Sequence, residues 1–269
     1  MDALFDRAIV LEKRSLGEDA IEALFLSETR GKFWGKAPAV ARSRKRFPAG
    51  IEYFTLFETE LGQTARQKKS GWMSVKMARP LVRYTLTRDM AHYSIAARMT
   101  ELINRLMPAG VGEESAIDTA ESRALFNLLI TSYATLEAAP PEKTDIVQVW
   151  FEWRLLVLLG YAIDPFRCTA CDKKFGEDTP ARWCAGAQSI TCADCTGNEA
   201  DTCKTLSFPA LQLAQKLSHT PVPGGFSQKA TMPATTVTAV DEIKALLENQ
   251  IKLLLTRPLK SDDFMKTGG

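Results

Sequence analysis

Four cysteines in the second half of the chain constrain the fold more than any other feature. They form two pairs, with two residues inside each pair and twenty residues between the pairs: Cys168, Cys171, Cys192 and Cys195. A two-residue gap lets both thiolates of a pair turn toward a common point, and two such pairs can close a tetrahedron around zinc. The spacing therefore predicts a structural Zn²⁺ site, since four thiolate ligands leave no open position for a substrate.

Other interpretations of these cysteines are a disulfide framework, a redox-active pair or ordinary buried thiols. An exported disulfide protein needs a positively charged and then apolar leader. The chain instead begins MDALFDRAIV, with Asp2 and Asp6 where positive charge is required. A thioredoxin-type pair would follow a strand and open a helix, whereas Cys168 follows a loop of residues 164–167. The pattern therefore favours a metal-binding module in a reducing compartment.

Three other residues bear on the metal site. Cys184 and Cys203 are further thiols, and either could replace one of the four ligands. Asp172 follows the first cysteine pair, at a position where a zinc knuckle often has glycine. We expect the affinity for zinc to depend on how Asp172 is accommodated.

Positive charge is concentrated in one stretch of the chain. Between Arg30 and Arg88 there are 14 Lys or Arg residues and three acidic residues, although the whole chain has a formal net charge of only +2. A solvated charged face is one explanation. Charge this one-sided favours an anionic partner, and nucleic acid above others.

Two segments of this stretch interleave cations with aromatic rings, residues 30–36 (RGKFWGK) and 42–47 (RSRKRF). Single strands are bound by such combinations, because cations neutralise phosphates and rings stack on unpaired bases. Phe33, Trp34 and Phe47 also suit the core of a barrel, so which rings contact bases stays open. The predicted nucleic-acid-binding residues are Arg30, Lys32, Lys36, Arg42, Arg44, Lys45, Arg46, Lys68 and Lys69.

The first third of the chain has the pattern of a small β-barrel. Short apolar or alternating segments, separated by Gly or polar residues, occur at residues 8–11, 21–26, 51–61, 64–69 and 72–76. Four to six short strands in about 80 residues, without helical periodicity, favour a barrel.

From residue 88 onward the apolar residues follow a helical period. The third predicted helix has Asp145 as its expected cap, is apolar nearly all round as a buried central helix would be, and ends at Gly160. The predicted helices cover residues 88–107, 125–136, the segment from 145 to 159, 208–217 and 243–255.

The sequence contains no recognisable catalytic or membrane-spanning motif. Residues 31–37 have one residue too few between their glycines, and lack the hydroxyl residue, of a phosphate-binding loop. His92 is expected to be a hydrogen-bonded side chain at the surface or half-buried, and not a catalytic residue. The longest apolar run, 146–159, contains three polar or charged residues and is too short to cross a bilayer. We therefore expect no enzyme activity and no membrane partner.

Several segments resemble the RecO family of bacterial recombination-repair proteins. Residues 31–32 (GK) followed by 41–47 (ARSRKRF) are similar to that family's glycine–lysine motif and basic loop, and residues 53–61 (YFTLFETEL) to one of its strands. Residues 150–161 (WFEWRLLVLLGY) resemble the helix before its zinc site, and residues 257–261 (RPLKS) match the motif that closes its last helix. The order of these motifs covers nearly the whole chain.

The resemblance implies an α+β fold with an amino-terminal OB-fold β-barrel, followed by an α-helical bundle with an inserted four-cysteine zinc module. The implied domains are residues 1–85 for the OB fold, 86–163 together with 205–269 for the helical domain, and 164–204 for the zinc module.

RecO proteins bind single- and double-stranded DNA, anneal complementary strands and, with RecR, help load RecA onto DNA covered by single-strand-binding protein. The resemblance implies the same DNA, RecR and single-strand-binding-protein contacts here, with RecA as an indirect partner. It also implies a cytoplasmic, nucleoid-associated role in DNA repair and recombination. The alternative is a zinc-stapled RNA-binding module or a subunit of an RNA- or DNA-processing enzyme, and competition between folded RNA and single-stranded DNA would separate the two.

Overall fold

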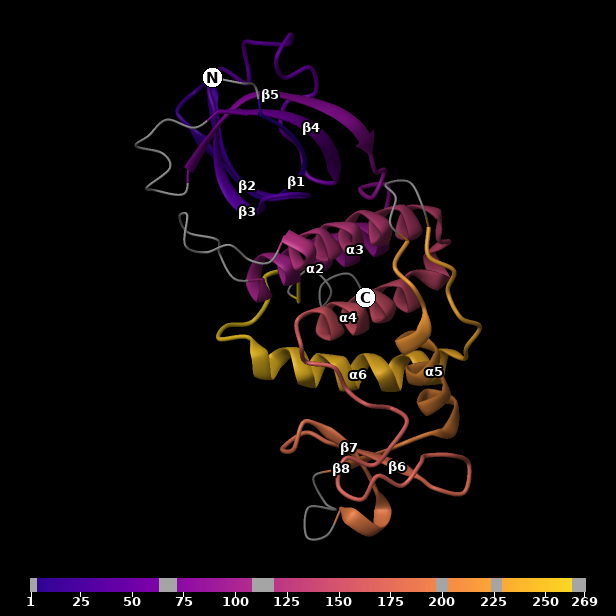
Figure 1. Cartoon of the computed structure of the whole chain (residues 1–269). Helices are drawn as coiled ribbons and strands as arrows, with labels where there is room; N and C mark the ends of the chain where they lie inside the picture. The colour runs from indigo at the N-terminus through magenta and orange to yellow at the C-terminus, as the bar shows by residue number, and fades with distance from the viewer. Residues whose placement is uncertain (1–3, 63–71, 108–118, 197–202, 224–228, 263–269) are drawn as a thin grey trace. The chain divides into compact units, whose positions relative to one another are not determined.

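The computed structural model describes residues 4–62, 72–107, 119–196, 203–223 and 229–262 (Figure 1). The chain divides into two compact units. The first unit comprises Met1–Ala139, Pro223–Lys229 and Leu259–Gly269, and the second comprises Pro140–Val222 and Ala230–Pro258. The division into an OB-fold domain, a helical domain and a zinc module stays a prediction, because contacts do not show which segments fold on their own.

A closed five-stranded barrel begins the first unit. Its strands are β1 (Leu4–Leu16), β2 (Ala20–Ser27), β3 (Gly31–Ala37), β4 (Thr55–Gly62) and β5 (Trp72–Arg83). Their order around the barrel is β1-β2-β3-β5-β4, and β1 pairs with β4 to close it. Every neighbouring pair is antiparallel except β3 with β5. The expected α+β fold with an amino-terminal OB-type barrel is therefore confirmed.

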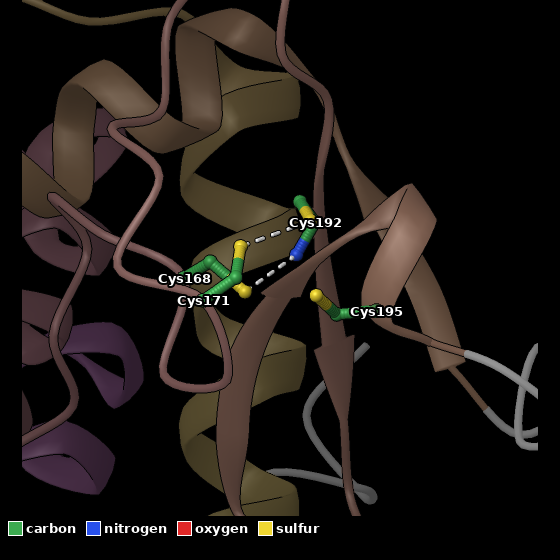
Figure 2. Close-up of side chains that lie close together, drawn as sticks. All are labelled: Cys168, Cys171, Cys192 and Cys195. Atoms are coloured by element: carbon green, nitrogen blue, oxygen red, sulfur yellow. Dashed lines mark hydrogen bonds between the residues drawn. The ribbon is translucent and has the colours of Figure 1, made fainter.

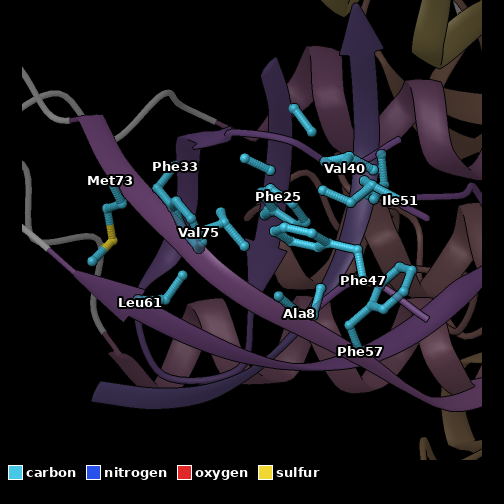
Figure 3. Close-up of a cluster of buried hydrophobic side chains, with 14 residues drawn as sticks. Ala8, Phe25, Phe33, Val40, Phe47, Ile51, Phe57, Leu61, Met73 and Val75 are labelled. Carbon is cyan, nitrogen blue, oxygen red and sulfur yellow. The ribbon is translucent and has the colours of Figure 1, made fainter. Parts of the chain in front are cut away.

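The barrel interior is filled by alternate side chains of its strands (Figure 3). Phe25 of β2 stacks on Phe33 of β3 with ring centroids 5.4 Å apart. Phe57 of β4 and Val75 of β5 complete the interior, with Phe47 from the loop between β3 and β4. Two of the three rings that the sequence left open, Phe33 and Phe47, are thus core residues.

Strand β3 and the start of β4 differ from the predicted pattern. β3 contains two glycines, and at Gly31 (φ +68°) a Cβ atom would lie only 2.8 Å from Ser122 Oγ. Residues 51–54 precede β4 instead of belonging to it, since Phe54 has a positive φ of 54° that ends extended pairing. The predicted segment 64–69 lies outside the described residues.

Two helices and the end of the chain complete the first unit. The helices are α2 (Met90–Leu106) and α3 (Thr119–Ala138). Asp89 caps α2 by accepting a hydrogen bond from the backbone N–H of His92 at 2.9 Å. Further along α2, the carboxylate of Glu101 accepts the backbone N–H groups of Lys260 and Ser261, both at 2.9 Å. The RPLKS segment therefore fastens the end of the chain to this helix.

The second unit combines three helices with a small sheet. The helices are α4 (Thr144–Leu158), α5 (Phe208–His219) and α6 (Val237–Leu254), and the sheet has the order β7-β6-β8, formed by Ser189–Cys192, Ala181–Cys184 and Cys203–Leu206. α4 packs against α5 and α6 and is buried on nearly all sides, as its sequence predicted. Trp153 Nε1 on α4 donates to Ser218 Oγ on α5 at 3.1 Å.

The prediction for α4 is wrong at the start of the helix and correct at its end. Asp145 does not cap the helix, because Lys143 occupies the N-cap position and no side chain makes a capping bond. Asp145 lies in the first turn and binds Lys244 of α6 at 2.8 Å. Gly160, with φ +80°, follows the C-cap residue Leu159 as expected for a left-handed glycine. None of the described helices is both long and apolar enough to cross a membrane.

Candidate nucleic-acid interface and metal site

The basic segment lies on a loop, residues 38–54, that connects β3 to β4 and that we call the basic loop. Three of its apolar side chains, from Val40, Phe47 and Ile51, are buried in the barrel core. The backbone N–H of Ala78 on β5 also donates to the carbonyl of Arg46 at 3.0 Å. The loop is therefore held against the barrel at several points, which leaves its charged side chains at the surface.

The four cations of the basic loop differ in their surroundings. Arg42 is 72% exposed and binds Asp19, in the turn between β1 and β2, at 2.7 Å. Arg44 and Lys45 are exposed, and neither forms an ion pair with a described residue. The Nε of Arg46 donates to a serine hydroxyl of the same loop at 3.1 Å. Three of the charges thus face solvent, and the fourth also braces the loop.

The remaining predicted interface residues are spread along β3 and beyond it. Lys36, just before the basic loop, binds Glu22 of β2 at 3.1 Å while half of its side chain stays exposed. Arg30 lies beyond the opposite end of β3, about 20 Å away along the strand, with Asp6 at 3.8 Å. Lys68 and Lys69 lie outside the described residues. Lys36 therefore lies next to the basic loop, whereas Arg30 lies beyond the far end of β3.

Lys32 is buried, although it was predicted to bind nucleic acid. Its ammonium donates to the carbonyls of Asn104 and Met107 in the last turn of α2, at 2.8 and 2.6 Å. Burial lowers its pKa to about 8, and the charge of Glu12 partly opposes this shift. In this position the lysine satisfies two carbonyl groups that a helix end leaves without partners. Lys32 is therefore left out of the interface proposed below.

The four cysteines lie together in the second unit (Figure 2). Cys168 and Cys171 come from the loop before β6, Cys192 ends β7, and Cys195 ends the short 3₁₀ turn that follows. Their Sγ atoms all lie within 4.8 Å of one another, and those of Cys171 and Cys192 are 3.8 Å apart. Thiolates in a tetrahedron with Zn–S bonds near 2.3 Å are ~3.8 Å apart, so these four residues suit a tetrahedral metal ion.

The sulfur atoms of this cluster are electrostatically unlike one another. Burial alone would raise the pKa of Cys168, but backbone N–H groups of Cys192, Ala170 and Cys171 donate to its sulfur and lower the pKa to about 6. The pKa of Cys195 is raised to about 12, because its thiol is hydrogen-bonded to Cys171 and Cys192. A cation among the four sulfurs would favour the deprotonated form of all of them.

Asp172 adopts the backbone conformation for which a knuckle often uses glycine. Its φ is +60°, a value that aspartate tolerates better than most residues. Its N–H donates to the carbonyl of Cys168, and the N–H of Cys168 donates to the carbonyl of Lys173, both at 2.9 Å. The Asp172 carboxylate binds Arg167 at 2.6 Å. The tight turn around the first cysteine pair is therefore formed without glycine.

Cys184 and Cys203 form a disulfide with each other. They lie directly opposite on the antiparallel strands β6 and β8, a register that brings their side chains together. The expectation that either could replace a metal ligand is therefore wrong. The sequence spacing gave no indication of this pairing, because it depends on which strands are neighbours.

His92 has both ring nitrogens hydrogen-bonded and is fully buried. Nδ1 lies 2.8 Å from the Asp89 carboxylate, and Nε2 lies 3.0 Å from the carbonyl of Ala139. The hydrogen-bonded role agrees with the prediction, but the expected surface or half-buried position is wrong, because the ring is fully buried.

One group of candidate residues was missed from the sequence. Trp34 of β3 stacks on Trp72 of β5, and Arg14, Glu22 and Lys36 surround the pair. The parallel pairing of β3 with β5 places Trp34 opposite Trp72. No local sequence pattern reveals that β3 pairs with β5, because the two strands are far apart in the chain. Only Trp34 and Lys36 of this group were therefore considered as candidate residues from the sequence.

The chain therefore has one unit with an OB-type barrel that carries a basic loop, and a second unit of helices with four clustered cysteines that could hold a metal ion. The family model described as "Recombination protein O C terminal" matches residues 87–263. Proteins named DNA repair protein RecO from Geobacter metallireducens and Geobacter sulfurreducens are 29% and 28% identical to the chain, over 99% and 96% of it and 98% and 96% of their own lengths. The one from Heliobacterium modesticaldum is 30% identical over 61% of this chain and 54% of its own length. The chain therefore belongs to the RecO family of DNA repair proteins.

Proposed function

We propose that this protein binds single- and double-stranded DNA through its barrel, anneals complementary strands and, with RecR, helps load RecA onto DNA coated by single-strand-binding protein. The observation that carries the proposal is the basic loop, which is anchored on an OB-type barrel by buried apolar residues while Arg42, Arg44 and Lys45 face solvent. Lys36 extends this positive surface along β3. Family membership supplies the recombination partners of the proposal.

A surface of this kind suits a phosphate chain for electrostatic reasons. Each Lys or Arg that neutralises a phosphate releases condensed counterions, which favours binding at low salt. Among the described residues Arg42 forms an ion pair with the carboxylate of Asp19, and the Arg42 side chain is 72% exposed. Such pairs contribute little stability, so a phosphate can replace the carboxylate at small cost.

The metal of the proposal is Zn²⁺ held by Cys168, Cys171, Cys192 and Cys195. Four thiolates would complete its coordination, so the ion would supply rigidity to the loop before β6 and to the end of β7. We assign it a structural role and assign no reaction to the protein, which would act without turnover in the cytoplasm, at the nucleoid.

The first test is the salt dependence of binding to single-stranded DNA. If about six phosphates are neutralised, log K should fall with log salt with a slope near −4, so that a fourfold rise in salt weakens binding roughly 300-fold. Changing Arg42, Arg44 and Lys45 to Gln should reduce the magnitude of this slope by about 2. The matched control changes Lys174, Lys204 and Lys252, three exposed lysines of the second unit, to Gln. Equal slopes in the two triple variants would place the interface elsewhere.

The second test measures annealing. The zinc-loaded protein should accelerate the pairing of complementary strands without ATP, and the basic-loop triple variant should lose most of this acceleration. Competition between folded RNA and single-stranded DNA belongs to the same experiment. A preference for the folded RNA would favour an RNA-binding module over the proposed function.

A further inference from the structure

A pair of tryptophans stands on the outer face of the barrel, and its position follows from strand alternation. Phe33 and Met73 point into the core, so their neighbours Trp34 and Trp72 point outward. The two outward rings are half-buried, and they stack with centroids 5.7 Å apart and planes 29° from parallel. Two stacked tryptophans that are not fully buried give the barrel an apolar patch on its outer face.

Two cations lie over the tryptophan rings. The guanidinium of Arg14 lies 4.8 Å from the ring centre of Trp34, and the ammonium of Lys36 lies 4.8 Å from that of Trp72. Both cations have about half of their side chains exposed. Each one covers a ring face that could otherwise contact a flat ligand, and each reaches solvent at its charged end.

Glu22 holds the two cations in place. Its carboxylate binds Arg14 at 2.8 Å and Lys36 at 3.1 Å, while its own side chain is only 8% exposed. Although burial acts to raise the pKa of Glu22, the hydrogen bonds from Lys36 and Arg14 lower it. One of the two positive charges is therefore neutralised within the cluster, so ring contact has to supply much of any affinity for a ligand there.

This cluster lies on the part of an OB fold that commonly binds oligonucleotides, the face of the second and third strands with its flanking loops. Trp34 and Lys36 belong to β3, Glu22 belongs to β2, and Arg14 lies near the turn between β1 and β2. Lys36 is also next to the basic loop. A strand whose phosphates lie on that loop would present its bases to the tryptophans.

We infer that Trp34 and Trp72 form a stacking platform for unpaired bases, with Arg14 and Lys36 moving from the ring faces to the phosphates when a strand binds. This inference rests on the proposed function and deepens it, because it names single-stranded nucleic acid with accessible bases as the ligand of this face. Base–aromatic stacking is stronger than the cation–π contact that it replaces at an exposed site. Bases paired in a duplex cannot make the same contact.

The test compares an oligothymidylate with an abasic sugar–phosphate strand of equal length. The native protein should bind the oligothymidylate at least about tenfold more tightly, and changing both Trp34 and Trp72 to Leu should abolish this preference. The salt slope should not change in the double variant, whereas it falls in the basic-loop variant. Changing Phe5, an exposed ring of β1, to Leu is the control and should keep the preference.

Intrinsic fluorescence provides a measurement that needs no substitution. The other three tryptophans, Trp150, Trp153 and Trp183, are at most 2% exposed, so quenching by a bound strand reports on Trp34 and Trp72. The oligothymidylate should quench the tryptophan fluorescence, and the abasic strand should not.

A conservative substitution provides a further control. Changing both Trp34 and Trp72 to Phe should keep the preference for the oligothymidylate, because an aromatic ring remains at each position.

The outcomes separate this inference from the proposed function. Equal affinity of the native protein for both strands would overturn the stacking platform and leave DNA binding by the basic loop intact. Binding of neither strand at low salt would overturn both.

Discussion

Lys32 belongs to a motif that resembles the RecO family, yet its role differs from the one that the sequence predicted. Its neighbour Gly31 has no room for a Cβ atom beside Ser122, and Lys32 itself donates to the last carbonyls of α2. The glycine–lysine pair therefore packs β3 against two helices, Gly31 against α3 and Lys32 against the end of α2. A phosphate-binding role was the natural expectation from sequence, because a lysine in a basic stretch is usually exposed.

The buried ammonium predicts a specific pH dependence of stability. The pKa of Lys32 is about 8 in the folded chain and 10.5 ordinarily, so between these values the unfolded chain binds more protons. The free energy of unfolding should therefore rise with pH in this window, by up to about 3 kcal/mol at 1.36 kcal/mol per unit. Lys32→Met should lack this rise in denaturant titrations at pH 7.5 and pH 10. Lys36→Met controls for the loss of one charge from the same strand, and parallel curves for Lys32→Met and the native chain would contradict the prediction.

Two substitutions of Asp172 should differ in their effect on the affinity for zinc. Asp172→Gly should keep the affinity for zinc within about threefold, since glycine adopts φ +60° freely and the lost contact with Arg167 is exposed. Asp172→Val should weaken zinc binding roughly tenfold or more, because a β-branched residue in this conformation is strained by at least 1–2 kcal/mol. Competition with a chromophoric chelator measures both. Equal affinities of the two variants would show that the turn is not strained.

At the scale of elements, Phe47 is the largest of the three side chains that hold the basic loop in the barrel core. Phe47 is 2% exposed and fills the barrel together with Val40 and Ile51. Phe47→Ala should lower the free energy of unfolding by about 3–5 kcal/mol. It should also weaken oligonucleotide binding, because the loop loses its anchor. Thermal unfolding and binding at low salt check the two effects, and an unchanged affinity in the folded variant would mean that the charges act without a fixed loop.

Elements with strong periodicity were predictable, and elements defined by distant partners were not. The stripes behind α2, α3 and α6 and the all-round apolar sequence of α4 led to the correct helices, although α6 begins at Val237, before the predicted segment 243–255. β3 was missed, since its glycines and cations conceal the alternation of Phe33 with Trp34. The gathering of the four cysteines followed from spacing alone. The disulfide, the burial of Lys32 and the tryptophan pair each depend on which elements lie together, which no local pattern contains.

At the scale of the whole molecule, the metal site and the basic loop belong to different compact units. Removing the metal with a chelator, or changing Cys192 to Ser, should therefore destabilise the second unit while single-strand affinity stays within about threefold. Separate unfolding of the two units by calorimetry, with the binding measured in parallel, checks this. A loss of oligonucleotide affinity that follows the loss of metal would contradict it.

The return of the RPLKS segment to α2 has a consequence for how the chain can be divided. Because Lys260 and Ser261 bond to Glu101, both chain ends belong to the unit that contains the barrel, and the backbone crosses between the units four times. The second unit is thus an insertion within the first and not an appended tail. A protease that cuts the first crossing therefore leaves two segments of the first unit, Pro223–Lys229 and Leu259–Gly269, on the same fragment as the second unit, and a gene ending after α3 would omit both segments.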